Sequence, residues 1–375
     1  MRTQNLVGSG LFGALFLWAA WVAGAADLDA PYVMRDGAGK LEGWTVEATP
    51  AGPAKRTSPL KPGSKITVAA VGNAPAFTVK LRPPAELAPD KITTVKSPPL
   101  FVVADTHGEY QILTAMLIKH AVVDARLRWS FGRGHLVILG DVFDRGPNQT
   151  EILWLLYALE AEARDAGGGV DFVLGNHETM ALRGDLRYLN PKYREVTTAL
   201  GVGSYSRLFA ANSVLGQWLR TRPTVLQIDH LLFLHGGISK DLVARGFALS
   251  EINGTVRAVL NDGAYVNEVA RERADFLFGE SGPLWYRGYF ADEAGVTAAS
   301  DEDVRLARQR FGVDRILVGH TRVPTITPLY GGQVIAVQVY PRRDSSGNTS
   351  FEALLIRDGM LLRARPDGST EPLLP

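Results

Sequence analysis

Five short apolar runs in this 375-residue chain are each followed at once by side chains that bind metals or transfer protons. In chain order these side chains are Asp105 and His107, Asp141 and Asp144, Asn176 and His177, His235, and His320. Oxygen and imidazole ligands suit divalent ions of intermediate hardness such as Mn²⁺, Fe²⁺ and Zn²⁺. One carboxylate can also bridge two ions about 3.5–4 Å apart, an arrangement that activates water and holds phosphate oxygens. The residue types therefore predict a site for metal-assisted hydrolysis, provided that the fold brings them together.

The apolar runs have the texture of strands buried on both faces, because they lack polar alternation. They comprise residues 100–103, 136–139, 172–174, 231–234 and 316–318. Between the second and third runs, apolar side chains recur at helical spacing over 152–159, and glycines at 167–169 end the pattern. This alternation predicts an α/β sheet with helices on both faces. Ligands of such sheets bind beyond the carboxyl ends of the strands, so the five clusters should converge there.

Each cluster alone has an ordinary structural interpretation. A single His after a strand is usually a structural residue, and a single Asp there is often a helix cap. Four of the seven histidines fall in the clusters, however, and the clusters follow five successive predicted strands, which favours function. Downstream, β-type runs at 334–339, 351–356 and 360–362 predict antiparallel strands that complete a second sheet.

The N-terminal 26 residues have the layout of a secretory signal peptide, with Arg2, an apolar run and a small-residue ending at 23–26. A permanent membrane anchor is the alternative, although the apolar run is shorter than the ~20 residues that span a bilayer. Cleavage predicts a periplasmic or secreted protein without stable membrane insertion. The chain holds 40 Lys and Arg against 39 Asp and Glu, so loss of Arg2 leaves no net charge and no basic excess for nucleic acid.

Residues 27–96 contain short β-type runs separated by turn residues, which predicts a small β-rich accessory module. A partly ordered pro-segment or linker is the alternative interpretation of this stretch. The chain has no Cys, which excludes disulfides, thiolate catalysis and Cys-based zinc sites. Residues 97–375 are then expected to form the catalytic domain.

The motifs, read in order, resemble the signature of calcineurin-like metallophosphoesterases. They are Asp-x-His-Gly at 105–108, Gly-Asp-x-x-Asp-Arg-Gly at 140–146, Gly-Asn-His-Glu at 175–178, His-Gly-Gly at 235–237 and Gly-His-Thr at 319–321. The forms at 144–146 and 176–178 resemble the phosphoprotein phosphatase branch, and within it the bacterial Shewanella-like phosphatases. The resemblance implies a two-sheet αββα sandwich preceded by a small N-terminal β module.

Roles for individual residues follow from the resemblance. Asp105 and His107 would bind a first metal ion, and Asp141 would bridge two ions. The second ion would be completed by Asn176, His235 and His320. His177 would be the general acid, oriented by Asp144. Arg145 and Arg287 would bind the phosphate, although Arg287 lies in a weaker motif and could be a surface residue beside aromatic side chains.

The implied activity is hydrolysis of a phosphomonoester by a metal-bridging hydroxide, with two divalent ions (Mn, Fe or Zn) as cofactors. The implied substrates are phosphotyrosine or phosphoserine and phosphothreonine proteins, or a small phosphoester. A nucleotide or dinucleotide polyphosphate hydrolase is one alternative, and an inactive exported binding protein is another. Arg322 stands where many relatives carry a further His, so the first ion is expected to have one ligand fewer. The oligomeric state, the metal identity and the physiological substrate do not follow from the sequence.

Overall fold

The computed structural model describes residues 28–87, 98–262, 265, 267–290 and 295–374. A six-stranded sheet has the order β18-β17-β16-β6-β7-β8. Its parallel half comprises β6 (Leu100–Val103), β7 (His135–Ile138) and β8 (Gly169–Phe172). Its antiparallel half comprises β16 (Ala353–Arg357), β17 (Met360–Ala364) and β18 (Thr370–Pro372). The predicted signal peptide lies outside the described residues.

A second sheet has five strands in the order β12-β13-β11-β10-β9. These are β9 (Val225–Ile228), β10 (Leu231–Leu234), β11 (Arg315–Val318), β12 (Thr327–Leu329) and β13 (Val334–Ala336). Strands β10, β11 and β13 run parallel, with antiparallel β9 and β12 at the edges.

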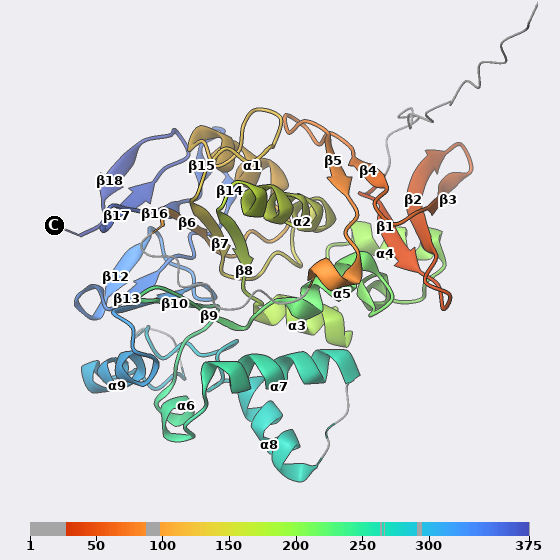
Figure 1. Ribbon diagram of the computed structural model, residues 1–375. Helices are drawn as coiled ribbons and strands as arrows, with labels where there is room; N and C mark the ends of the chain where they lie inside the picture. The colour runs from red at the N-terminus through yellow and green to blue at the C-terminus, as the bar shows by residue number, and fades with distance from the viewer. Residues whose placement is uncertain (1–27, 88–97, 263–264, 266, 291–294, 375) are drawn as a thin grey trace, which may run out of the picture.

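Side-chain alternation along the strands explains why the two sheets stack. Leu100 and Val102 of β6 point into a core that also contains Leu232 and Ile316 of the second sheet. Phe101 of β6 and its neighbours on the other face pack beneath α1 (Tyr110–Lys119) and α2 (Gln149–Asp165). The outer layer of the second sheet includes α6 (Lys240–Ala244), α7 (Leu249–Asp262) and α9 (Asp301–Phe311). The predicted αββα sandwich is therefore confirmed (Figure 1).

The C-terminal runs do not all enter the second sheet, and that prediction was wrong. The run at 334–339 supplies β13 of the second sheet, but the runs at 351–356 and 360–362 form β16 and β17 beside β6 in the first. The short apolar runs fit either sheet equally well, because both sheets are covered on both faces. Their pairing is decided by long-range contacts that the local pattern does not contain.

The insert between the third and fourth motifs is mainly helical. It holds α3 (Asn176–Arg183), α4 (Lys192–Leu200), the 3₁₀ helix η2 (Tyr205–Phe209) and α5 (Val214–Thr221). Helix α8 (Glu268–Leu277) packs on α7. Shorter elements are the 3₁₀ helices η1 (Pro84–Leu87) and η3 (Tyr330–Gly332), and the strand pair β14 (Arg342–Arg343) and β15 (Thr349–Ser350).

The predicted N-terminal β module is present in the described residues. Strands β1 (Tyr32–Arg35), β2 (Leu41–Thr49) and β3 (Gly52–Leu60) form an antiparallel meander, and β4 (Lys65–Val68) pairs with β5 (Phe77–Lys80). These strands lie at one end of the molecule against α2, α4 and α5 (Figure 1). Their apolar side chains share one continuous core with α1 and α2. The exact domain limits stay a prediction.

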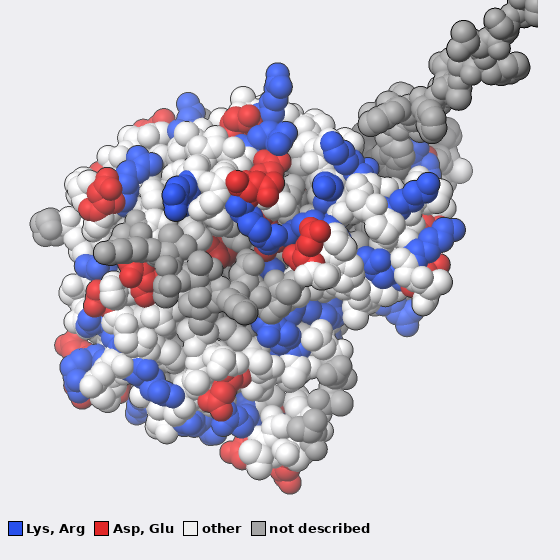
Figure 2. Space-filling view, viewed as in Figure 1, with Lys and Arg blue, Asp and Glu red and all other residues white. Residues whose placement is uncertain are grey.

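The surface carries no large patch of one charge on the face shown in Figure 2, where basic and acidic side chains are interspersed. This agrees with the balanced composition of the sequence. Among the residues that the structure describes, no helix combines the length and the apolar character needed to cross a bilayer.

A buried carboxylate joins the N-terminal module to the catalytic part. Glu160 on α2 accepts hydrogen bonds from Arg82 at 2.6 Å, from Arg222 at 2.5 Å and from the Trp218 indole at 2.8 Å. Burial would raise the pKa of Glu160, but the two guanidinium groups hold it below its ordinary value. The carboxylate therefore stabilises the fold at neutral pH, and this contribution fades as pH falls through its depressed folded pKa.

We expect Glu160→Gln to lower the free energy of unfolding by about 3–5 kcal/mol, because it leaves two buried guanidinium groups without a counter-charge. Denaturant unfolding followed by tryptophan fluorescence measures this. The control is Glu302→Gln, which removes an exposed pair with Arg305 and should change little. A Glu160→Gln protein as stable as the parent would contradict the assignment.

Candidate active site

The five predicted clusters meet at one place, where the carboxyl ends of strands from both sheets come together. Asp105 and Asp141 follow β6 and β7 of the first sheet, and Asn176 begins α3 after β8. His235 and His320 follow β10 and β11 of the second sheet. All the predicted metal-ligand side chains are buried, and they lie on the rim where the sheets adjoin.

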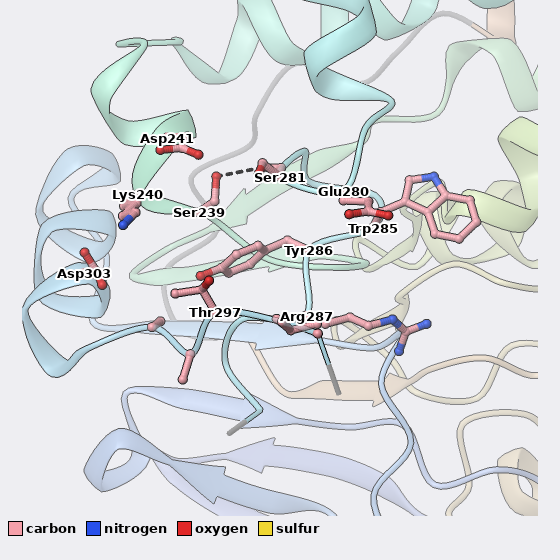
Figure 3. Close-up of a pocket in the computed structure, with 14 residues that line it drawn as sticks. Ser239, Lys240, Asp241, Glu280, Ser281, Trp285, Tyr286, Arg287, Thr297 and Asp303 are labelled. Atoms are coloured by element: carbon pink, nitrogen blue, oxygen red, sulfur yellow. Dashed lines mark hydrogen bonds between the residues drawn. The ribbon is translucent and has the colours of Figure 1, made fainter. Parts of the chain in front are cut away.

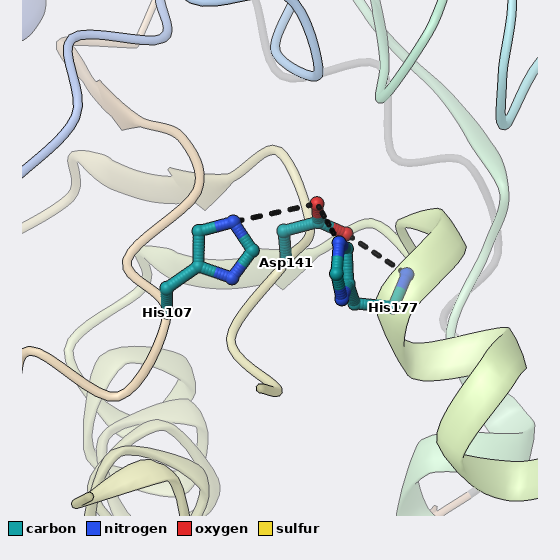
Figure 4. Close-up of side chains that lie close together, drawn as sticks. All are labelled: His107, Asp141 and His177. Atoms are coloured by element: carbon teal, nitrogen blue, oxygen red, sulfur yellow. Dashed lines mark hydrogen bonds and ion pairs between the residues drawn. The ribbon is translucent and has the colours of Figure 1, made fainter. Parts of the chain in front are cut away.

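Asp141 lies at the centre of this group. Its Oδ2 atom is 3.8 Å from His107 Nε2, 3.7 Å from His177 Nε2 and 3.2 Å from His235 Nε2. Figure 4 shows the rings of His107 and His177 approaching the carboxylate from opposite sides. A carboxylate surrounded by imidazole nitrogens in this way has the position needed to bridge two metal ions.

The backbone orients two of the imidazole rings. His107 Nδ1 lies 2.8 Å from the Phe143 carbonyl oxygen, and His235 Nδ1 lies 2.6 Å from that of Leu139. A carbonyl oxygen can only accept, so each Nδ1 carries a proton and each Nε2 is the ring atom that faces Asp141. Deprotonated imidazole nitrogen is the form that binds a metal ion.

Two of the remaining predicted ligands lie against His235. Asn176 Oδ1 lies 2.8 Å from His235 Nε2, and His320 Nδ1 lies 3.1 Å from the same atom. Asp105 accepts the backbone N–H of His320 on its Oδ2. The side chains form two groups that could each hold a metal ion, and Asp141 belongs to both. The first group is His107, Asp141 and His177, and the second is Asp141, His235 and His320.

Several of these atoms are buried without a hydrogen-bond partner, and they include Asp105 Oδ1, His107 Nε2 and His320 Nε2. Buried polar atoms normally have a hydrogen-bond partner, so a cluster of buried polar atoms without one requires an explanation. Burial raises the pKa of Asp105 to about 8 and lowers that of His107 to about 3. Oxygen and nitrogen donors in this arrangement fit divalent cations, which would satisfy the orphaned atoms and favour the deprotonated forms of both groups.

The backbone is strained at the same residues. Positive φ angles occur at Asp105, His107, Asp141, Asp144, Arg145 and His320. Non-glycine residues reach this region at a cost of about 1–3 kcal/mol each, and such residues cluster at functional sites. Close backbone approach adds to the constraint, since a Cβ at Gly146 would lie 2.2 Å from the His107 carbonyl oxygen.

Glu178 is a site residue to which the sequence analysis gave no role. Its buried carboxylate accepts the backbone N–H groups of Asp141, Val142 and Gly175 at 2.7–2.8 Å. It therefore clamps the turn that follows β7 onto the start of α3. Glu178 is part of the motif at 175–178. The role of its carboxylate depends on contacts with a turn more than 30 residues away in the chain, which the motif itself does not indicate.

His177 and Asp144 form a tight pair. His177 Nδ1 lies 2.6 Å from Asp144 Oδ2, and both side chains are buried. Burial alone would lower the pKa of His177, but the carboxylates of Asp141 and Asp144 raise it above the ordinary value. The imidazole is thus suited to hold a proton at Nε2, near the centre of the site. The same geometry also allows His177 to act as a ligand, because its Nε2 belongs to the first donor group.

The two predicted phosphate-binding arginines have different neighbours in the site region. The Arg145 guanidinium is 5.9 Å from the ring of Tyr188 and 5.9 Å from that of Tyr340. Tyr340 also faces His107, with ring centroids 5.8 Å apart. Arg322, which replaces a possible ligand, stacks over Tyr340 at 4.4 Å and does not occupy the centre.

Arg287 is half-buried and belongs to the site region. Its Nη1 donates to the His320 carbonyl at 3.2 Å and to Thr321 Oγ1 at 3.1 Å. Its neighbour Trp285 meets the His320 ring edge-on at 5.6 Å. Arg287, Lys240 and Asp303 are among the residues that line a cavity of about 540 Å³. In Figure 3 the Arg287 side chain extends away from Lys240 and Asp303.

Comparison with known proteins agrees with this geometry. Shewanella-like protein phosphatase 2 of Arabidopsis thaliana is 26% identical over 59% of this chain and 66% of its own length. Shewanella-like protein phosphatase 1 of Plasmodium berghei is 23% identical over 60% of this chain and 62% of its own. The chain thus spans somewhat less than two thirds of these relatives.

A solved structure, the cold-active protein-tyrosine phosphatase of a psychrophilic Shewanella species, is similar over almost the whole chain. It is 33% identical, covers 92% of this chain and 99% of its own, and superposes with a TM-score of 0.78. Residues 98–324, which contain all five clusters, match the calcineurin-like phosphoesterase family. With a matching family domain over more than half of its length, the chain belongs to the calcineurin-like phosphoesterases.

Proposed function

We propose that this protein is a metal-dependent phosphomonoesterase that removes phosphate from proteins, with phosphotyrosine as its preferred substrate. The observation that carries the proposal is the donor cluster around Asp141, with the His177–Asp144 pair at its edge. The phosphotyrosine preference rests on the similarity to the Shewanella protein-tyrosine phosphatase.

Six side chains would hold the metal ions in the proposed mechanism. Asp105, His107 and Asp141 would hold one divalent ion, and Asp141, Asn176, His235 and His320 would hold a second. When bound, the ions supply Lewis acidity and make water more acidic. Mn²⁺, Fe²⁺ and Zn²⁺ fit this mixed oxygen and nitrogen set.

Side chains that do not hold the ions would perform the remaining steps. Asp144 accepts a hydrogen bond from His177 Nδ1–H and thereby keeps Nε2 directed at the centre. His177 would donate its Nε2 proton to the leaving oxygen of the substrate. Arg145 and Arg287 would bind phosphate oxygens, because guanidinium groups pair with phosphate through two N–H donors.

Export to the periplasm or the cell exterior is also proposed. It rests on the pattern of residues 1–26 alone, which lie outside the described residues. N-terminal sequencing of the protein recovered from its native compartment would test both the cleavage and its position. Recovery of the chain with residues 1–26 intact in the cytoplasm would refute export.

We expect His177→Asn to lower kcat on a phosphotyrosine peptide by about 10²-fold or more, because the leaving oxygen loses its proton donor. Metal content, measured by mass spectrometry of the purified protein, should stay at the parent level. His230→Asn is the matched control, since His230 is exposed and precedes β10, at the opposite end of that strand from His235. Loss of metal in His177→Asn would instead identify His177 as a ligand.

Chelation should abolish activity, and adding Mn²⁺, Fe²⁺ or Zn²⁺ one at a time should restore it, because the site's charge balance requires cations. Initial rates on phosphotyrosine, phosphoserine and phosphothreonine peptides and on dinucleotide polyphosphates then rank the substrates. The proposal predicts the highest kcat/KM for phosphotyrosine. Faster turnover of dinucleotide polyphosphates would contradict the phosphotyrosine preference and favour a nucleotide or dinucleotide polyphosphate hydrolase. No turnover of any substrate with any metal would favour an inactive binding protein.

A further inference from the structure

The loop that carries Asp144 and Arg145 is held from outside by the segment before and at the start of α4. The Arg145 backbone N–H donates to the Tyr188 carbonyl at 3.1 Å, and Asn190 Nδ2 donates to the Arg145 carbonyl at 2.7 Å. Lys192 Nζ donates to the Pro147 carbonyl at 2.7 Å. These contacts fix the backbone on both sides of Arg145.

Such support matters because the backbone of the loop is strained. Asp144 and Arg145 both have positive φ, a conformation that persists only where surrounding contacts enforce it. Within the loop, the Gln149 side chain accepts the Asp144 backbone N–H at 2.5 Å. Gly146 N–H also donates to the carbonyl oxygens of Asp144 and His107. The backbone groups of Arg145 and Pro147 bond to the segment at 188–193, which leads into and begins α4.

Lys192 is itself anchored by a residue of the N-terminal module. Its ammonium group lies 2.7 Å from Asp29 Oδ1, whereas the nearest other carboxylate, that of Glu151, is 3.6 Å away. Asp29 is only 4% exposed. Its Oδ2 accepts from the hydroxyl groups of Tyr32 and Thr150, and Thr150 lies in the first turn of α2, just after the loop.

We infer that Asp29 is a positioning residue for the reaction, acting through Lys192 on the Pro147 carbonyl and so on Asp144 and Arg145. The inference rests on the proposed phosphatase function. Without the Asp29 charge, the mostly buried ammonium group of Lys192 loses its close counter-ion and with it the geometry that directs it at Pro147. A shift of the loop by about 1 Å would misplace the Asp144–His177 pair, which can cost about 10²-fold in rate.

The position of Asp29 in the chain gives this contact a further consequence. Asp29 lies three residues after Ala26, the last residue of the predicted signal peptide. The first residues of the mature chain would then complete the support of the catalytic loop, which lies more than 110 residues further on. The N-terminal module therefore contributes to catalysis as well as to the shared core.

The test compares Asp29→Asn with the parent protein on two substrates, phenyl phosphate and 2,4-dinitrophenyl phosphate. Phenolate is a poor leaving group that needs the His177 proton, whereas dinitrophenolate leaves without one. We expect kcat on phenyl phosphate to fall at least about tenfold more than kcat on dinitrophenyl phosphate. His177→Asn should show the same selectivity more strongly.

The matched control is Arg82→Met, which also removes a buried ion pair between the module and α2 but does not touch the loop. It should lower the thermal midpoint as Asp29→Asn does, while leaving the ratio of the two rates at the parent value. Lys192→Met should reproduce the altered ratio, and the double variant with Asp29→Asn should be no worse than either single change. If the Asp29→Asn protein does not fold, the rate ratio of Lys192→Met tests the inference in its place.

Equal losses on both substrates in Asp29→Asn and Lys192→Met would overturn the inference and reduce the pair to a stabilising contact. That outcome leaves the proposed function intact, because the parent protein still hydrolyses both esters. A parent protein that hydrolyses neither ester with any added metal would refute the proposed function, and the inference with it.

Discussion

The Asp141 carboxylate, surrounded by imidazole rings in a buried site, is the constraint on which the rest of the structure depends. Asp141 Oδ2 lies within 4 Å of three histidine nitrogens that come from different parts of the chain. Such a cluster of buried polar groups is unfavourable unless cations complete it. The fold brings the carboxyl ends of two stacked sheets to one rim, and strained backbone at several of these residues holds the donors there.

The surrounding side chains each preserve this arrangement by a specific contact. Glu178 binds the backbone of the turn after β7, and carbonyl oxygens of Phe143 and Leu139 set the orientation of two imidazoles. The pair of His177 and Asp144 adds an imidazole whose pKa is raised by neighbouring carboxylates. The geometry of the site is therefore supported mainly by hydrogen bonds between loops that follow the strands of the two sheets.

The N-terminal module has a closer relation to this site than its composition indicates. Its apolar side chains share a core with α2, and Arg82 shares the Glu160 carboxylate with Arg222. Asp29 is paired with Lys192, whose ammonium group binds the backbone of the catalytic loop. The module and the catalytic part thus form a single packed unit in which buried charges join distant segments.

The sequence by itself determined the residue types, the strands that carry them and the order of the motifs, because buried strands and metal donors both leave local patterns. It predicted the convergence of Asp105, Asp141, His235 and His320 correctly. Tertiary structure alone decided that β16 and β17 join the first sheet, that Glu178 clamps the turn beside Asp141, and that Asp29 reaches Lys192. These features depend on contacts between residues far apart in the chain, and no local spacing encodes which buried carboxylate meets which partner.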